Sequence, residues 1–226
     1  MANRPALEFF FDVSSPWTYL AFEGIGPIAA EAGVAVAWRP ILVGGVFNAV
    51  NPSVYAAREQ PVPAKSAYLA KDLQDWARHA GLRIVFPPAV FPVNSVKAMR
   101  ACVLLEPDGR LVPFARAAFE AYWRDDLDLS RDEVLARVCE RAGVDWAELA
   151  AGIARPEIKE RLKANTDELI ARGGFGSPTV FVGGTDLYFG NDRLPLVREA
   201  LARAGRRDGR TDAPADAPAA SQATLR

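Results

Sequence analysis

The sequence has few residues that bind metals or form disulfides. Its 226 residues include one histidine and two cysteines, Cys102 and Cys139. This is too few for a structural zinc site built from cysteine and histidine, so we expect no metal. The two cysteines lie far apart in helix-like surroundings. This favours small core residues over a disulfide, and it indicates the reducing cytoplasm as the compartment.

Long hydrophobic runs and an excess of one charge are also absent. Lys and Arg number 27 against 28 Asp and Glu, so no basic excess favours nucleic acid. No apolar run approaches the roughly 20 residues that a membrane-spanning helix requires. Residues 1–7 lack the apolar core of a signal peptide. We therefore expect no nucleic-acid partner, no membrane partner and a cytoplasmic location.

The first forty residues predict a parallel β-α-β unit. Leu7–Val13 (LEFFFDV) is an apolar run of strand length, expected to be buried on both faces. Ser15 followed by Pro16 is typical of a helix start, with the serine as N-cap and the proline as first helical residue. The helix should span residues 17–32, and Val34–Arg39 alternates like a second strand.

The middle of the chain changes character. Residues 41–63 are rich in Gly, Asn and Pro and predict a long irregular loop. The following pattern is helical, and Ser130 with Glu133 three residues later matches a capping box. The expected helices are 65–80, 94–106, 111–124, 130–142, 145–152 and 156–171.

Strand patterns return near the C-terminus. Pro178–Val182 and Thr185–Phe189 predict a strand pair, followed by a helix over 192–204 that Asn191 or Asp192 would cap. As a separate domain the two strands would form a marginally stable hairpin. We therefore expect an α/β protein with a thioredoxin fold into which an all-helical domain is inserted.

This interpretation divides the chain into three parts. Residues 1–45 and 172–205 would form a discontinuous thioredoxin-like domain, and 46–171 the loop and helical insertion. Residues 206–226 repeat DAPA, contain no aromatic residue and predict a disordered tail.

The turn Ser15-Pro16-Trp17-Thr18 is the strongest chemical motif. Thioredoxin-like redox proteins carry Cys-Pro-x-Cys at this place, but both cysteine positions hold hydroxyls here. Thiol–disulfide exchange through this motif is therefore excluded. A helix N-terminus still favours an anion, including a thiolate from another molecule, to which Ser15 could donate a hydrogen bond. The alternative is that Ser15 is only an N-cap.

Two further motifs lie near the C-terminus. Ser177-Pro178 precedes a strand, where a thioredoxin fold holds a cis-proline whose neighbour offers its backbone to a peptide-like ligand. A trans turn is the alternative, because only about 5–6% of such bonds are cis. Asn191 and Asp192 could hold the charged end of a ligand, or merely cap a helix.

Four segments together resemble the 2-hydroxychromene-2-carboxylate isomerases and the kappa-class glutathione transferases. They are FFFDVSSPWTYLAFE, WRPILVGGVF, FPVNSVKAMRA and GGFGSPTVFVGGTDLYFGNDRLPLV, and the resemblance covers residues 7–203. It implies a DsbA-like thioredoxin fold with a helical insertion, glutathione as cofactor, a small aromatic carboxylate as substrate, and a homodimer.

The resemblance also implies site residues. Ser15 matches the catalytic serine that contacts the glutathione sulfur, with Pro16 and Trp17 beside it. The glutathione cysteinyl unit would pair with the backbone at Ser177, before Pro178. The γ-glutamyl end would bind Asn191 and Asp192.

Substrate residues are matched more loosely. Asn51 and Lys65 fall near loop positions that close over glutathione and substrate. Asn48 stands where the family often has a lysine that binds a substrate carboxylate, a role that Lys65 or Lys97 could take over.

The resemblance implies a glutathione-dependent isomerase of bacterial aromatic catabolism. It would interconvert 2-hydroxychromene-2-carboxylate and trans-o-hydroxybenzylidenepyruvate through transient thiolate addition. A kappa-like glutathione transferase and a non-catalytic thioredoxin-like binding module are the alternatives.

Overall fold

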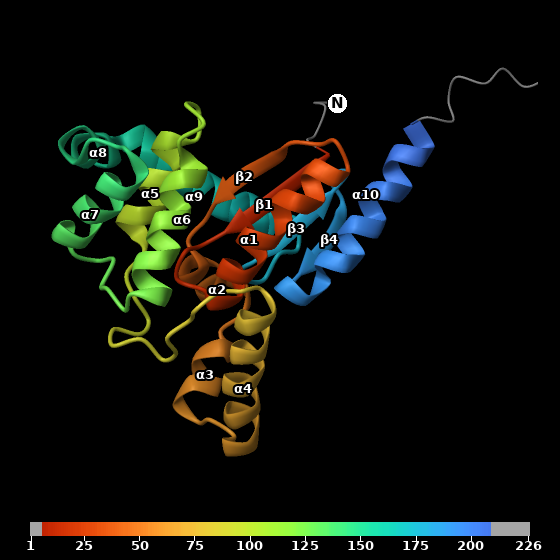
Figure 1. Ribbon diagram of the computed structural model, residues 1–226, viewed down its shortest axis with the longest axis horizontal. Helices are drawn as coiled ribbons and strands as arrows, with labels where there is room; N and C mark the ends of the chain where they lie inside the picture. The colour runs from red at the N-terminus through yellow and green to blue at the C-terminus, as the bar shows by residue number, and fades with distance from the viewer. Residues whose placement is uncertain (1–5, 209–226) are drawn as a thin grey trace, which may run out of the picture.

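The computed structural model describes residues 6–208, in which four strands form one mixed sheet. The strands are β1 (Leu7–Phe11), β2 (Val36–Pro40), β3 (Thr179–Val182) and β4 (Asp186–Phe189), in the order β2-β1-β3-β4. β1 pairs with β2 in parallel and with β3 antiparallel, and β3 and β4 are antiparallel. The predicted thioredoxin fold with a helical segment between its two parts is confirmed (Figure 1).

The sheet is covered by helices on both faces. Phe9 and Phe11 of β1 pack toward α1 (Pro16–Glu31), whereas Phe10 packs with Phe181 of β3 on the opposite face. α10 (Leu194–Asp208) lies beside α1, and α9 (Pro156–Ala171) lies behind the sheet (Figure 1). The expected burial of β1 on both faces is confirmed.

A helical block lies beside the sheet, on the left in Figure 1. It contains α5 (Val96–Leu105), α6 (Leu111–Phe119), which continues as a wider turn over Glu120–Arg124, α7 (Asp132–Ala142) and α8 (Trp146–Ile153). The indole N–H of buried Trp123 donates to the carbonyl of Val13 at 2.9 Å, which ties this block to the end of β1. Cys102 and Cys139 are buried and unpaired, as predicted for core residues.

The prediction of an irregular loop over residues 41–63 is wrong. α2 (Val43–Val50) and α3 (Ser53–Glu59) occupy it, and α4 begins at Pro63 and ends at His79. The glycines of α2 disfavour a helix locally, but Val46 is buried with Phe10 beneath the sheet, so tertiary packing prevails. α3 and α4 extend away from the sheet as an arm (Figure 1).

The predicted caps also differ from the structure. The predicted capping box does not form, because the N-cap position of α7 is one residue later than predicted, at Arg131, and the helix has no side-chain cap. Ser130 instead belongs to the preceding turn, where its backbone N–H donates to the Asp128 carboxylate at 2.9 Å. A short 3₁₀ turn, Asn191–Arg193, precedes α10, with Gly190 in the N-cap position.

Two further observations concern the predicted tail and membrane spans. α10 continues to Asp208, so the boundary predicted at residue 206 falls inside a helix, and residues 209–226 of that tail lie outside the described residues. Within residues 6–208 no helix combines the length and apolar character needed to cross a bilayer.

Candidate functional site

A cleft of about 640 Å³ opens where β1 ends and α1 begins. The chain turns there through Ser14 and Ser15, and Ser177 reaches the same place from the segment before β3. α2, α3 and the segment 86–96 supply the other walls. Ligands of α/β proteins commonly bind at this end of the strands, so this cleft is the candidate site.

Ser15 is both an N-cap and a residue of the cleft. Its extended backbone places Oγ where it accepts from the Thr18 N–H at 3.2 Å, while its hydroxyl donates to the Ser177 carbonyl at 3.3 Å. The second bond is longer than usual for a hydroxyl donor, so the proton can be redirected to a ligand. Within the described residues the backbone N–H of Trp17 has no hydrogen-bond partner. The tip of α1 thus presents two donors.

The Ser177–Pro178 peptide bond is cis. Buried Ser177 lies against α1, with its Oγ 2.8 Å from Thr18 Oγ1, and it accepts from the Asp12 N–H at 3.0 Å. Thr18 occupies the position of the second redox cysteine. In a redox protein this cysteine would form a disulfide with the first cysteine of the same motif. Thr18 instead forms a hydrogen bond from α1 to the cis-proline segment.

Asp12 is a site residue that sequence reasoning missed. Its carboxylate is buried, accepts the Ser14 N–H at 3.0 Å and the Val43 N–H at 2.9 Å, and borders the cleft. Burial raises the pKa of Asp12 above its usual value of 3.8, against the opposing effect of these bonds. An acidic residue at the end of a buried strand is a sequence signal for a functional residue. Its partner on α2, however, lies 31 residues away in the sequence. Asp12 holds the Ser14–Ser15 turn against the start of α2.

A second hollow of about 300 Å³ adjoins the first and shares Trp17 and Ser177 with it. Asn191, Asp192 and Arg193 line it, and the Arg193 guanidinium donates to the Asp192 carboxylate at 2.7 Å. The structure therefore brings the two C-terminal motifs to the tip of α1.

Gly190 sets the direction of the turn that carries these residues. Its φ of +106° is one that other residues rarely adopt, and an added Cβ would lie 2.6 Å from Asp192 Oδ1. Only glycine fits here while Asp192 keeps its place beside the hollow.

The residues present fit glutathione. An extended peptide needs backbone partners, and within the described residues the Ser177 N–H has none, so it remains available beside the cis-proline. A thiolate fits the donors of Ser15 and Trp17. The γ-glutamyl end carries an ammonium and a carboxylate, which match the acid and base at positions 192 and 193.

The predicted substrate residues are only partly brought together. Asn51 borders the cleft and donates to a backbone carbonyl at 3.1 Å. Asn48 is exposed, and its side-chain oxygen accepts from the Tyr55 hydroxyl at 2.9 Å. Lys65 is exposed on the arm and is not among the residues that line either hollow, and Lys97 forms an ion pair with an aspartate of α7.

Arg58 is a second residue that sequence reasoning missed. Among the described residues that border the cleft, it is the only one with a cationic side chain. Its guanidinium lies over the rings of Phe47 and Phe91. No signal in the sequence indicates it. The sequence predicts a loop over residues 41–63, and the two rings that hold the guanidinium come from separate segments.

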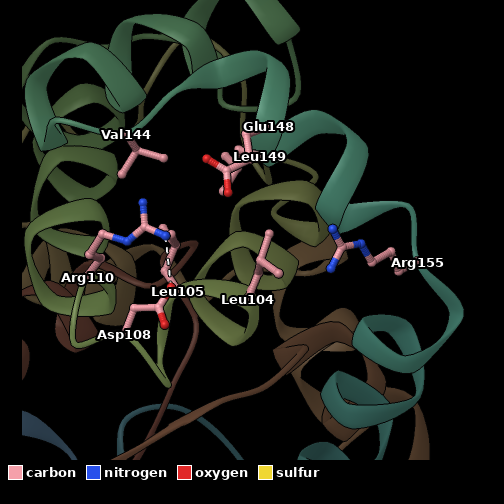
Figure 2. A pocket seen from close by; sticks show the side chains of 8 residues that line it. All are labelled: Leu104, Leu105, Asp108, Arg110, Val144, Glu148, Leu149 and Arg155. Atoms are coloured by element: carbon pink, nitrogen blue, oxygen red, sulfur yellow. Dashed lines mark hydrogen bonds and ion pairs between the residues drawn. The ribbon is translucent and has the colours of Figure 1, made fainter.

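A third hollow lies in the helical block, and its volume is about 170 Å³. Figure 2 shows leucine and valine side chains facing a few charged ones, with Arg110 paired to Asp108. None of its lining residues is a nucleophile of the Ser, Cys or Lys type. It offers no chemistry like that at Ser15.

Comparisons with known proteins agree with the thioredoxin fold described above. The family model described as the DSBA-like thioredoxin domain matches residues 6–202. The 2-hydroxychromene-2-carboxylate isomerase of Pseudomonas putida is 28% identical over 202 residues, which are 89% of this chain and 97% of that protein. Human glutathione S-transferase kappa 1 is 30% identical over 210 residues, 86% and 90% of the respective chains.

A solved structure gives the same result for the fold. The structure of a 2-hydroxychromene-2-carboxylate isomerase superposes with a TM-score of 0.75 at 26% identity, and covers 92% of this chain and 99% of the other. The likeness therefore extends over the sheet and the helical block together.

Proposed function

Because the chain belongs to the DSBA-like thioredoxin domain family, and within it to the group of 2-hydroxychromene-2-carboxylate isomerases and kappa-class glutathione transferases, we propose that it is a glutathione-dependent isomerase. Its substrates would be 2-hydroxychromene-2-carboxylate and trans-o-hydroxybenzylidenepyruvate, in the breakdown of aromatic compounds. The reaction exchanges a ring-closed form for an open one, which requires rotation about a carbon–carbon double bond.

The position of Ser15 is the observation that carries the proposal. Its hydroxyl lies at the N-terminus of α1 and borders the large cleft, while Trp17 and Ser177 beside it border both hollows. A tripeptide in the smaller hollow would therefore present its central residue to Ser15, with the larger hollow left for a second molecule. The absence of a cysteine at positions 15 and 18 makes an external thiol necessary.

Glutathione, when bound, supplies the thiolate nucleophile that makes the double bond transiently single. The residues of this chain prepare that chemistry. Ser15 donates its hydroxyl proton toward the sulfur, and the partial positive charge at the start of α1 stabilises the anion. The backbone of Ser177 aligns the tripeptide. Asp192 and Arg193 hold its charged end.

The cleft supplies the environment of the second substrate. Phe47, Phe86 and Phe91 border it, and aromatic walls of this kind favour a flat ring and exclude water. About 640 Å³ is within the range typical of small-molecule sites and leaves space for rotation of a side chain on that ring.

A kappa-like glutathione transferase is the second candidate. The human kappa-class relative is 30% identical, and Asn48 removes the lysine that the isomerase resemblance leads one to expect. A transferase would consume one thiol per turnover, whereas an isomerase consumes none. A non-catalytic binding module would turn over neither kind of substrate and would not require a γ-glutamyl group.

An absorbance time course tests the proposal. Purified protein is mixed with 2-hydroxychromene-2-carboxylate, with and without glutathione, and free thiol is titrated at the end. We expect glutathione-dependent formation of the benzylidenepyruvate at constant thiol. Loss of thiol would favour the transferase, and an absence of both turnover and glutathione binding in folded protein would reject the enzymatic function.

The proposal also includes a homodimer in the cytoplasm, where glutathione is kept reduced. Light scattering at micromolar concentration checks the first part, with a mass of about twice the 24.5 kDa of one chain as the expected result.

A further inference from the structure

We propose that Arg58 binds the carboxylate of the second substrate and thereby selects planar aromatic anions for the large cleft. The inference rests on the proposed function in one respect, namely that a molecule other than glutathione occupies this cleft.

The side chain of Arg58 is placed by aromatic rings and has no partner of opposite charge. Its guanidinium carbon lies 5.5 Å from the centre of the Phe91 ring and 5.9 Å from that of Phe47. Within residues 6–208 no hydrogen bond or ion pair engages it. Most surface arginines in the part of the chain that the structure describes pair with a nearby carboxylate, as Arg116 does with Glu23. Arg58 is held at the cleft without such a pair.

The charge of Arg58 is also uncompensated inside the cleft. The other acidic or basic side chain that borders it is Asp12, whose carboxylate is buried and occupied by two backbone N–H groups. Burial opposes ionisation of that acid. An anion entering the cleft therefore meets one accessible cation and no accessible carboxylate among the described lining residues.

The surroundings of Arg58 suit a carboxylate attached to a flat ring. Tyr55 lies one turn earlier on α3, and its ring is perpendicular to that of Phe47, with the ring centroids 6.3 Å apart and an interplanar angle of 89°. Phe86 and Phe91 face the same cleft and lie 5.5 Å apart. A guanidinium offers two parallel donors to a carboxylate, while the rings receive the apolar part of the molecule.

The other polar residues considered for the substrate carboxylate bring no positive charge to the cleft. The side-chain oxygen of Asn48 is occupied by the Tyr55 hydroxyl, and an amide supplies no charge. Lys65 and Lys97 lie outside the residues that border the cleft. Among the described residues that border the cleft, Arg58 thus supplies the positive charge, and it lies on a helix that the sequence pattern did not predict.

A carboxylate could also come from the glycyl end of glutathione. The placement favours the second substrate, because Arg58 borders the large cleft and is absent from the lining of the hollow that holds Asn191, Asp192 and Arg193. The experiment separates the two sources.

The test measures binding without turnover. Calorimetric titrations of trans-cinnamate and its uncharged methyl ester are carried out on protein saturated with S-methylglutathione. The proteins are wild type, Arg58→Met, Arg58→Lys and the matched control Arg155→Met. Arg155 is another exposed arginine without an ion pair, and it borders the hollow of the helical block (Figure 2). Glutathione and its glycyl ethyl ester are titrated separately into the same four proteins.

We expect wild type and Arg155→Met to bind cinnamate about tenfold or more tighter than the ester, as a charged hydrogen bond implies. Arg58→Met should bind the two equally, Arg58→Lys should keep part of the preference, and glutathione affinity should not change. A preference that is absent in wild type, or that survives in Arg58→Met, overturns the proposal. Weaker glutathione binding in Arg58→Met, with its glycyl ester unaffected, assigns the residue to glutathione and equally overturns it. Failure of the proposed function would show instead as no glutathione binding in wild type.

Discussion

The hydroxyl of Thr18 lies 2.8 Å from the hydroxyl of Ser177, across 159 residues of sequence. Both side chains are buried, and Ser177 Oγ also accepts the Asp12 N–H at 3.0 Å. One serine hydroxyl therefore joins the end of β1, the first turn of α1 and the cis-proline segment. Redox proteins with this motif carry a cysteine at the position of Thr18, whereas here the threonine side chain has a structural role.

This junction predicts an unequal double-mutant cycle. Ser177→Ala leaves the Asp12 N–H and the Thr18 hydroxyl without partners and should lower the free energy of unfolding by about 2–4 kcal/mol. Thr18→Val removes one hydrogen bond and should lower it by about 1 kcal/mol. The double variant should be less destabilised than the sum of the two. Urea unfolding measures all three. Additive losses would show that the two hydroxyls do not interact.

Ser15 should affect the thiol as well as stability. Ser15→Ala removes an N-cap and should cost about 1 kcal/mol. It should also raise the pKa of bound glutathione and slow turnover, because the sulfur loses a donor. The pKa is read from thiolate absorbance near 240 nm.

Asp145→Ala is the matched control for Ser15→Ala. Asp145 caps α8 by accepting the Glu148 N–H at 2.7 Å, far along the chain from the cleft. It should lose comparable stability and keep the thiol pKa of wild type. If the two variants shift the thiol pKa alike, Ser15 acts only as a cap.

Asp192 should recognise the ammonium of the γ-glutamyl group. Asp192→Asn should weaken glutathione binding about tenfold, the size of one charged hydrogen bond. Glutaryl-cysteinylglycine lacks this ammonium, and it should bind wild type and variant equally. Asp108→Asn serves as control, since Asp108 is another exposed aspartate paired with a neighbouring arginine. Discrimination between the two peptides that persists in Asp192→Asn would contradict the assignment.

The raised pKa of Asp12 predicts that the contribution of this residue to the free energy of unfolding decreases as pH rises. Burial raises the pKa of Asp12 in the folded chain above its unfolded value near 3.8. The folded chain therefore keeps a proton that the unfolded chain has lost, and this contribution is complete below pH 3.8 and disappears as pH passes the raised value. Asp12→Asn cannot titrate. The free energy of unfolding of wild type minus that of the variant should decrease from about pH 4 upward, and parallel curves would contradict this.

The lowered pKa of Asp125 predicts the opposite pH dependence, in which the contribution of this residue to the free energy of unfolding increases as pH rises. A hydrogen bond from Arg124, with a further one from Arg141, lowers the pKa of Asp125 to about 2. Its contribution is therefore present above pH 3.8 and is lost as pH falls through about 2. Wild type should lose stability relative to Asp125→Asn over this range, by no more than about 1 kcal/mol because the groups are partly exposed. Acid titration of the unfolding transition of both proteins measures it.

The parts of the fold that sequence reasoning predicted correctly depend on local signals. β1 is a continuous apolar run, and Ser15-Pro16 marks the start of α1 by the chemistry of a cap and a fixed φ. α2 has the composition of a loop, and it is helical because Val46 finds a buried place under the sheet. No window of sequence contains that information.

The site divides in the same way. The Ser15 and Ser177 motifs are readable because each combines a turn with a strand or helix boundary. Asp12 and Arg58 are not readable. The first becomes a site residue by binding the start of α2, and the second by lying between rings from α2 and the segment after α4. Each depends on a distant partner that the fold supplies.

The place of β1 between β2 and β3 has a consequence for synthesis on the ribosome. When α9 has emerged, the chain already has its first strand, its first helix and its helical block, yet the side of β1 that pairs with β3 is still open. Such an edge invites pairing with other chains until it is covered. Ser177 and Asp192 arrive only with the last segments. The proposed glutathione site is therefore incomplete until nearly the whole chain has been translated, and a product truncated before β3 would lack that site and be prone to aggregate.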